Sequence, residues 1–103
     1  MVQMSWTFLT NHAHVLICLA SNPALRISEI ADPVGIGERA TQSIVNDLVE
    51  SGYVERTRVG RRNTYVVNPD RPLRHPLERG HDIGVLLDAL TPGHPAEVSS
   101  SRP

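Results

Sequence analysis

Residues 36–54, with the sequence IGERATQSIVNDLVESGYV, constrain the fold of this chain more than any other segment. At 3.6 residues per turn, residues 39–50 are predicted to form a helix. Its inward face, at the i, i+3, i+4, i+7 spacing, consists of Thr41, Ile44, Val45 and Leu48. Its outward face consists of side chains that can form hydrogen bonds: Arg39, Gln42, Ser43 and Asn46. Gly52 is predicted to end the helix, because glycine adopts the left-handed conformation there without a Cβ clash.

A basic hairpin is predicted directly after this helix. Residues 54–59 and 64–67 have the composition of two strands, and they flank the loop Gly60-Arg61-Arg62-Asn63. Glycine and asparagine suit the positive φ angles of such a loop. The hairpin arginines are Arg56, Arg58, Arg61 and Arg62.

The order of helix, turn, helix, Gly-Tyr and basic hairpin resembles the winged helix-turn-helix domains of small bacterial transcriptional regulators, broadly the MarR-like and ArsR-like groups. The matching sequence is ISEIADPVGIGERATQSIVNDLVESGYVERTRVGRRNTYVV. The resemblance implies a mostly α fold with a small antiparallel β-wing, followed by a C-terminal helix. It also implies sequence-specific binding of double-stranded DNA by a regulator. The outward side chains of residues 39–50 are predicted to contact base edges in the major groove, since arginine suits guanine and amides suit adenine. The four hairpin arginines are predicted to contact the DNA backbone or the minor groove. The cytoplasm is the default location, because no signal peptide is recognised.

The N-terminal third is predicted to supply two more helices. Residues 11–20 form the first, with Thr10 or Asn11 as its N-cap, and the preceding Trp6, Phe8 and Leu9 are expected to pack on the domain. Its buried side chains are expected to be Val15, Leu16 and Leu19.

The second helix is expected to begin with Ser28 as its N-cap. Pro33 should keep it short or kinked, because proline removes a hydrogen bond inside a helix. Residues 25–27 are expected to pair with the wing as a third strand, and Gly37 to cap the helix that follows.

The C-terminal part is predicted to form one helix over residues 76–90, starting at Pro76. Its apolar stripe consists of Ile83, Leu86, Leu87 and Leu90. The stripe either folds back on its own domain or meets a second copy, and a homodimer is favoured. The predicted division is therefore a DNA-binding domain over residues 1–75, a dimerisation or capping helix over 76–90, and a disordered tail over 91–103.

The charge distribution bears on the proposed partner. The net charge is −1 at pH 7, whereas DNA-binding proteins are usually basic. However, residues 54–74 contain six arginines and two acidic residues, so this segment carries +4 and the rest about −5. The alternative from another class is a winged helix that binds proteins without sequence-specific DNA binding. In that case the polar helix face is an ordinary solvated surface. The arginines then place charge on the exposed edges of the hairpin, which opposes aggregation.

Metal and redox sites are less well supported. His75 and His81, with Asp82, could bind zinc in a dimer as in ArsR-like sensors, but the paired cysteines of that group are missing. Cys18 is the only cysteine and is interpreted as a small core residue. No metal site and no cofactor are predicted.

Enzymatic and membrane functions are not indicated. Residues 35–40 match GxGxxA, but that dinucleotide fingerprint requires a preceding strand in a βαβ unit. No GxSxG, HExxH or P-loop is present. The apolar run at residues 15–20 is shorter than the roughly 20 residues that span a bilayer.

Overall fold

The computed structural model describes residues 6–90. Three helices, α1 (Asn11–Ser21), α2 (Ile27–Val34) and α3 (Glu38–Glu50), are followed by the strands β1 (Val54–Val59) and β2 (Arg62–Val67). A 3₁₀ helix (Pro76–Glu78) and α4 (Ile83–Leu90) complete this part of the chain. The predicted winged helix-turn-helix is confirmed. The predicted tail at residues 91–103 lies outside the described residues.

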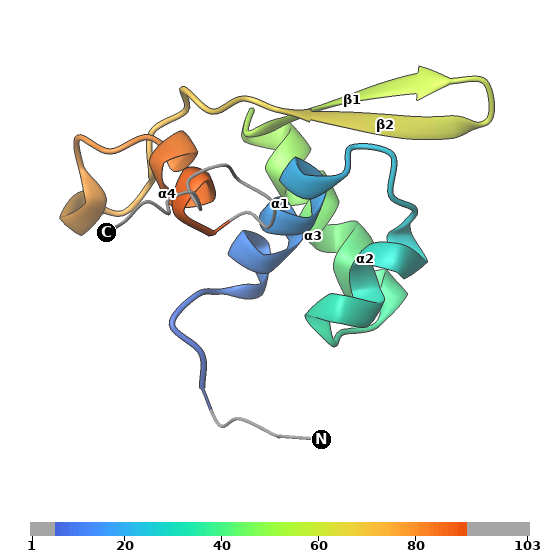
Figure 1. Cartoon of the computed structure of the whole chain (residues 1–103), viewed down its shortest axis with the longest axis horizontal. Helices are drawn as coiled ribbons and strands as arrows, with labels where there is room; N and C mark the ends of the chain where they lie inside the picture. Colours follow the sequence, from blue (N-terminus) through green and yellow to red (C-terminus); the bar gives the residue numbers. More distant parts are fainter. Residues whose placement is uncertain (1–5, 91–103) are drawn as a thin grey trace, which may run out of the picture.

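The hairpin of β1 and β2 runs along one side of the molecule, and the helices lie beneath it (Figure 1). Its base adjoins the helices, whereas its tip extends beyond them. The buried core joins α1, α2 and α3 to the base of the hairpin and to α4. Its largest fully buried apolar side chains are Leu19, Ile30, Val15, Val45 and Val54.

The start of α1 follows the sequence prediction, but the residues before it do not. Oγ1 of Thr10 accepts a hydrogen bond from the backbone N–H of Ala13, so Thr10 caps the helix. Trp6 and Phe8 were expected to pack on the domain, yet they are 66% and 91% exposed. Their rings contact each other edge to face, with centroids 4.9 Å apart, and Leu9 is half-buried.

The start of α2 differs by two residues from the prediction. Arg26, not Ser28, is the N-cap residue, and Oε1 of Glu29 accepts the Arg26 backbone N–H at 2.8 Å. Ser28 therefore lies inside the first turn, because Glu29 supplies the acceptor at the helix start. As predicted, Pro33 is followed closely by the helix end, and Gly35 adopts φ 86° there.

The predicted third strand is absent from the described residues, where the sheet has only β1 and β2. The segment before α2 nevertheless borders β2, since the Pro23 carbonyl accepts the Tyr65 N–H at 3.0 Å. Pro23 has no N–H to return, and α2 already begins at Ile27. These two features prevent a strand ladder from forming.

The hairpin loop is shorter than predicted. Arg62 already pairs with Val59, so β2 starts two residues earlier and the loop is only Gly60-Arg61. Gly60 has φ 62°, the conformation that a type II′ turn requires at its first central position. Asn63 pairs with Arg58 inside the strand instead of occupying the loop.

The single helix predicted over residues 76–90 is also wrong. The chain forms a 3₁₀ turn, passes through Gly80 at φ 91°, and starts α4 only at Ile83. The backbone N–H of Leu73 bonds to the His81 carbonyl, and that of Ile83 bonds to the Arg71 carbonyl, both at 2.9 Å. These long-range bonds hold the interruption in place.

The stripe on α4 is divided between the core and the surface. Ile83 and Leu87 are buried in the core of the same chain, and α4 packs on α1. Leu86 is half-buried, whereas Leu90 is 43% exposed. The helix therefore folds back on its own domain and presents part of its stripe to the outside.

Leu87→Ala is expected to lower the free energy of unfolding by about 2 to 3 kcal/mol, because it removes a buried side chain and leaves a cavity. Leu77→Ala is the matched control, with an expected loss of under about 1 kcal/mol because this side chain is 90% exposed. Urea denaturation of both variants provides the measurement. Equal losses would contradict the packing of α4 described above.

Candidate nucleic-acid interface

The outward face of α3 is set by the side chains that the helix buries. The four buried residues of α3 are the four predicted ones: Thr41, Ile44, Val45 and Leu48. The Thr41 hydroxyl, fully buried, donates to the Gly37 carbonyl at 2.9 Å, so its polar atom is satisfied. Gly37 is the N-cap residue, as predicted.

The predicted DNA-contacting residues of α3 lie on the opposite side. Arg39 and Ser43 are exposed, whereas Gln42 and Asn46 are half-buried. Nε2 of Gln42 lies 3.2 Å from Oδ1 of Asn46, one helical turn away. Arg39 has no hydrogen bond or ion pair to any residue between 6 and 90.

The wing arginines point in different directions. Arg56 and Arg58 alternate with Glu55 and Thr57 along β1, so they share the face on which Val54 is buried. Nη1 of Arg56 lies 3.1 Å from Oδ1 of Asn46, which connects the wing to α3. Nε of Arg58 donates to the Gly60 carbonyl within the hairpin at 3.2 Å.

The other two arginines lie at the tip and along β2. Arg62 donates from Nη2 to the Ala24 carbonyl at 2.8 Å and is therefore directed to the segment before α2. Arg61 is exposed in the loop and makes no hydrogen bond or ion pair within the described part of the chain. The structure thus brings Gln42, Asn46 and Arg56 together and leaves Arg39 and Arg61 projecting separately.

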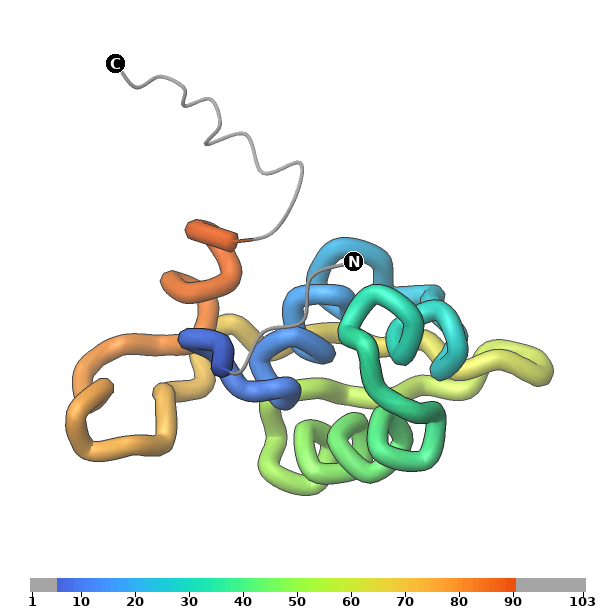
Figure 2. The backbone as a smooth tube through the Cα atoms, turned by 90° about the horizontal axis from the view of Figure 1, so that it is seen from below, coloured from blue at the N-terminus to red at the C-terminus, as the bar shows by residue number. Residues whose placement is uncertain are grey.

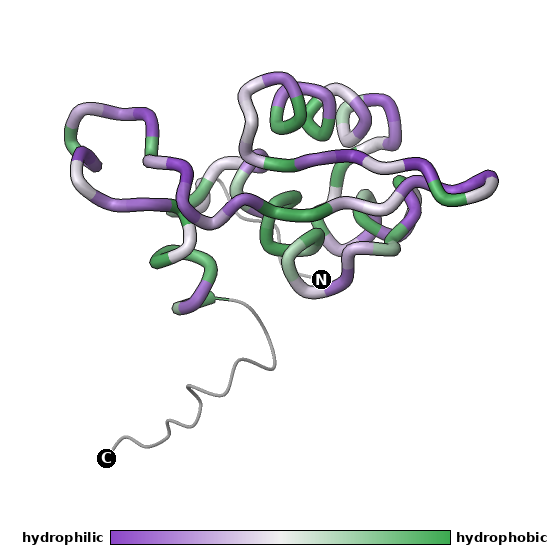
Figure 3. The backbone as a smooth tube through the Cα atoms, turned by 90° about the horizontal axis from the view of Figure 1, so that it is seen from above, coloured by the Kyte–Doolittle hydropathy of each residue, from purple (hydrophilic) through white to green (hydrophobic). Residues whose placement is uncertain are grey.

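The surface formed by α3 and the wing is not covered by the C-terminal helix. Seen along the perpendicular direction, α3 lies on one side of the hairpin and α4 on the other (Figure 2). The part of the hairpin beyond the helices is mainly hydrophilic (Figure 3). A partner can therefore reach the outward face of α3 and the wing together.

A contact between α1 and α3 is not predicted by the sequence. Nε2 of His12 lies 2.8 Å from Oδ2 of Asp47, and both side chains are exposed. The two residues are 35 positions apart, so no local pattern predicts that they meet. This pair directs Asp47 toward α1, on the edge of the outward face of α3.

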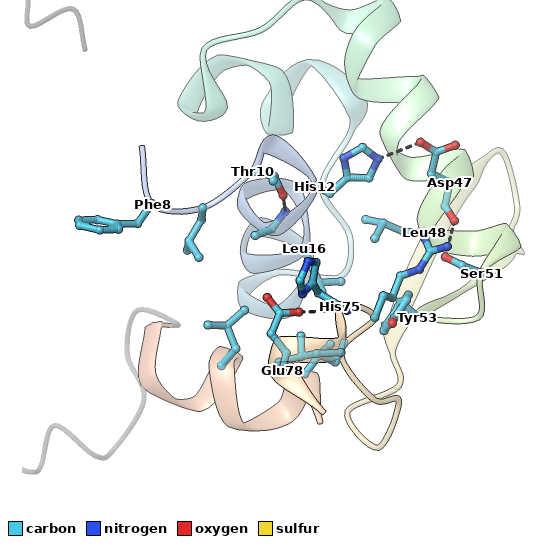
Figure 4. A pocket seen from close by; sticks show the side chains of 16 residues that line it. Phe8, Thr10, His12, Leu16, Asp47, Leu48, Ser51, Tyr53, His75 and Glu78 are labelled. Carbon is cyan, nitrogen blue, oxygen red and sulfur yellow. Dashed lines mark hydrogen bonds and ion pairs between the residues drawn. The ribbon is translucent and has the colours of Figure 1, made fainter. Parts of the chain in front are cut away.

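A cavity of about 430 Å³ opens beside this pair, between α1, the end of α3, residues 73–78 and α4 (Figure 4). Its wall is largely apolar, with several polar side chains among the lining residues. The lining residues include Phe8, Leu16, Leu48, Leu73, Ile83 and Leu86 together with His12, Asp47, Arg74 and Glu78. None of the predicted DNA-contacting residues lines it.

The side chains considered as metal ligands do not form a metal site in the described part of the chain. Among residues 6–90, no three His, Cys, Asp or Glu side chains are grouped closely enough to hold a metal ion. Nδ1 of His75 instead accepts the backbone N–H of Leu77 at 3.1 Å and caps the 3₁₀ helix. No helix in the same part of the chain is long and apolar enough to cross a membrane.

Comparison with known proteins gives limited similarity. The sequence matches no protein-family model, and no curated protein matches it. Among solved structures, the chain is similar to the zinc-dependent MarR family transcriptional regulator AdcR in the Zn(II)-bound state. That match has a TM-score of 0.46 and 24% sequence identity, and it covers 66% of this chain and 49% of that chain. The chain thus matches about half the length of AdcR.

Cys18 belongs to α1, outside the surface formed by α3 and the wing, and it is half-buried beside the core. Burial raises the pKa of the Cys18 thiol by disfavouring the thiolate. Alkylation by iodoacetamide should therefore be slower in the native protein at pH 8 than in urea, with its pH midpoint shifted upward. The pKa of Cys18 is therefore higher in the folded protein than in the unfolded chain. Its contribution to the free energy of unfolding is present below the unfolded pKa and is lost as pH rises through the folded pKa.

Mass spectrometry of the single cysteine measures both alkylation rates, and the urea-unfolded chain is the control. A native rate equal to or above the unfolded rate would contradict the burial effect and would make Cys18 a reactive thiol.

Proposed function

We propose that this protein is a transcriptional regulator that binds double-stranded DNA in a sequence-specific manner in the cytoplasm. In this proposal α3 enters the major groove, while the wing contacts the backbone or the minor groove. The observation that carries the proposal is the joint surface of α3 and the wing, with hydrogen-bonding side chains on the helix and arginines on the hairpin. The Arg56–Asn46 contact holds these two elements in a defined relation.

The dimensions and chemistry of α3 suit base recognition. The major groove is about 12 Å wide and admits a helix of about 10–12 Å diameter. Arg39 suits guanine, Gln42 and Asn46 carry amides that can pair with base edges, and Ser43 can donate or accept. All four side chains lie on the side of α3 away from the core.

The wing supplies the positive charge that α3 lacks. Glu38, Asp47 and Glu50 are exposed on α3, so phosphate contacts must come mainly from Arg58, Arg61 and Arg62. Arg56 lies farther back, where it bonds to Asn46 on α3. Arginine presents a planar fork of donors to phosphate oxygens and also enters a narrow minor groove. Such contacts give affinity, and the helix gives specificity.

A homodimer would double the recognised site. We propose that the C-terminal segment, residues 76–90, carries the contact through Leu86 and Leu90, while Ile83 and Leu87 hold α4 on its own domain. Leu90 and Val85 are 43% and 62% exposed, and Phe8 lines the same cavity as Leu86. Two half-sites strengthen binding that is weak for each domain alone.

A protein-interaction module without sequence-specific DNA binding is the second candidate. The exposed carboxylates of Asp47 and Glu50 on α3, together with the net charge of −1, favour it. In that case the outward face of α3 contacts a protein, and the wing arginines keep the hairpin edge soluble.

Binding of DNA is tested by selecting duplexes from a random library at near-physiological salt and measuring the affinity of variants for the enriched site. Arg39→Ala should weaken the enriched site about tenfold or more and random duplex little, because it removes a base contact. Arg61→Ala should weaken both and reduce the slope of log affinity against log salt by about 1, because it removes a phosphate contact.

Arg79→Ala is the matched control, since Arg79 is exposed directly after the 3₁₀ helix. The segment that contains this helix lies at the opposite end of the molecule from the wing tip (Figure 1). It should leave both affinities nearly unchanged. If no sequence is enriched and all three variants behave alike, the DNA proposal fails and the interaction module is favoured.

The dimer is tested by sedimentation equilibrium. A charge placed in the proposed contact by Leu90→Glu should shift the protein from dimer to monomer, because an unpaired carboxylate is costly in an apolar interface. Val59→Glu, at an exposed valine on the wing, is the matched control and should leave the dimer intact. A wild-type chain that sediments as a monomer at all concentrations would contradict the proposal.

A further inference from the structure

Three side chains form a connected set of hydrogen bonds between α3 and β1. Nε2 of Gln42 and Nη1 of Arg56 lie 3.2 Å and 3.1 Å from the same atom, Oδ1 of Asn46. We call Gln42, Asn46 and Arg56 the amide relay. A single carbonyl oxygen therefore joins the outward face of α3 to the wing.

The chemistry of arginine decides how both amides are oriented. A guanidinium has donors and no acceptor, so the Asn46 atom that faces Arg56 must be the carbonyl oxygen. Because the same oxygen faces Gln42, the Gln42 atom in contact with it must be the amide nitrogen. The oxygen and nitrogen positions of both side chains are thus assigned by their partner, whereas an isolated amide could be turned either way.

The relay leaves different hydrogen-bond donors and acceptors available on the Gln42 and Asn46 side chains. Oδ1 of Asn46 has two lone pairs and accepts two hydrogen bonds, so Asn46 has only its N–H donors left to offer. Gln42 uses one N–H on Asn46 and keeps Oε1 and its second N–H. No other hydrogen bond to a residue between 6 and 90 engages these groups.

These free groups match different bases. In the major groove, adenine presents the N7 acceptor beside the N6 donor, which complements the remaining N–H and Oε1 of Gln42. Guanine N7 and O6 and thymine O4 are acceptors, which complement the donors of Asn46. Residue type alone assigns adenine to both amides, whereas the relay assigns it to Gln42 only.

We propose that Arg56 is a positioning residue which, through Asn46, sets Gln42 to select adenine and Asn46 to select guanine or thymine. This inference rests on the proposed DNA binding and specifies its base preference. Arg56 then differs in role from Arg58, which lies on the same face of β1 nearer the tip and bonds only to the Gly60 carbonyl of its own loop.

The test is selection from a random duplex library with the full chain, in the wild type and in four variants: Gln42→Ala, Asn46→Ala, Arg56→Ala and Arg58→Ala. Gln42→Ala identifies the position that Gln42 contacts, because the preference there is lost. In the wild type this position should be adenine. Arg56→Ala and Asn46→Ala should weaken the adenine preference at the same position by roughly 5- to 50-fold, although Gln42 is still present.

Arg58→Ala is the matched control for the loss of one positive charge. It should weaken all duplexes alike, reduce the salt slope by about 1 and leave the preferred sequence unchanged. In the double variant of Gln42 and Arg56, the loss of adenine preference should be no greater than in Gln42→Ala alone, because both changes act on one contact. Circular dichroism verifies that each variant folds, which is expected since Arg56 is exposed.

Two outcomes would overturn the relay while leaving DNA binding intact. In one, Arg56→Ala keeps the full adenine preference and behaves like Arg58→Ala, which would make Arg56 a phosphate contact. In the other, the position identified by Gln42→Ala prefers a base other than adenine. If the wild type enriches no sequence at all, the proposed function itself fails, and the relay inference fails with it.

Discussion

Burial of Thr41 and Val45, neither of which is exposed at all, removes the freedom of α3 to rotate about its own axis. Turning the helix by one residue, about 100°, would expose these side chains and bring Gln42 into the core. Apolar burial on one side therefore determines which side chains face outward. Gly52 then ends the helix, and Val54, almost fully buried in the same core, attaches the wing beside it.

The wing depends on contacts outside the hairpin. An isolated two-stranded sheet is only marginally stable in water, so contacts outside the hairpin must hold it. Tyr65 is buried and its N–H bonds to the Pro23 carbonyl, and Arg56 bonds to Asn46 on α3. Beyond these contacts the hairpin extends past the helices with Gly60-Arg61 at its end. Arg62, next to this turn, also bonds to the Ala24 carbonyl, so the wing is tied to the segment before α2 as well as to α3.

The apolar stripe of α4 is divided between the core of the domain and its surface. Ile83 and Leu87 complete the core against α1, and this packing places Leu86 and Leu90 toward the outside. Because α4 lies on the other side of the hairpin from α3, a contact made through α4 would not compete with one made through α3. In the proposed dimer, a second copy on this exposed part would add apolar burial to a small core with few aromatic residues.

The sequence by itself determined the features that depend on local physics. The 3.6-residue periodicity of residues 39–50 predicted all four buried side chains of α3. Local chemistry predicted a cap at Thr10 or Asn11, of which Thr10 forms it, and the Gly52 stop. Contacts between distant residues decided the rest. The break before α4 depends on backbone bonds to residues 71–73, and the His12–Asp47 pair spans 35 positions. Four predicted DNA-contacting residues were identifiable on the helix, but the Arg56–Asn46 bond that orients two of them forms only when β1 packs beside α3, which no local pattern encodes.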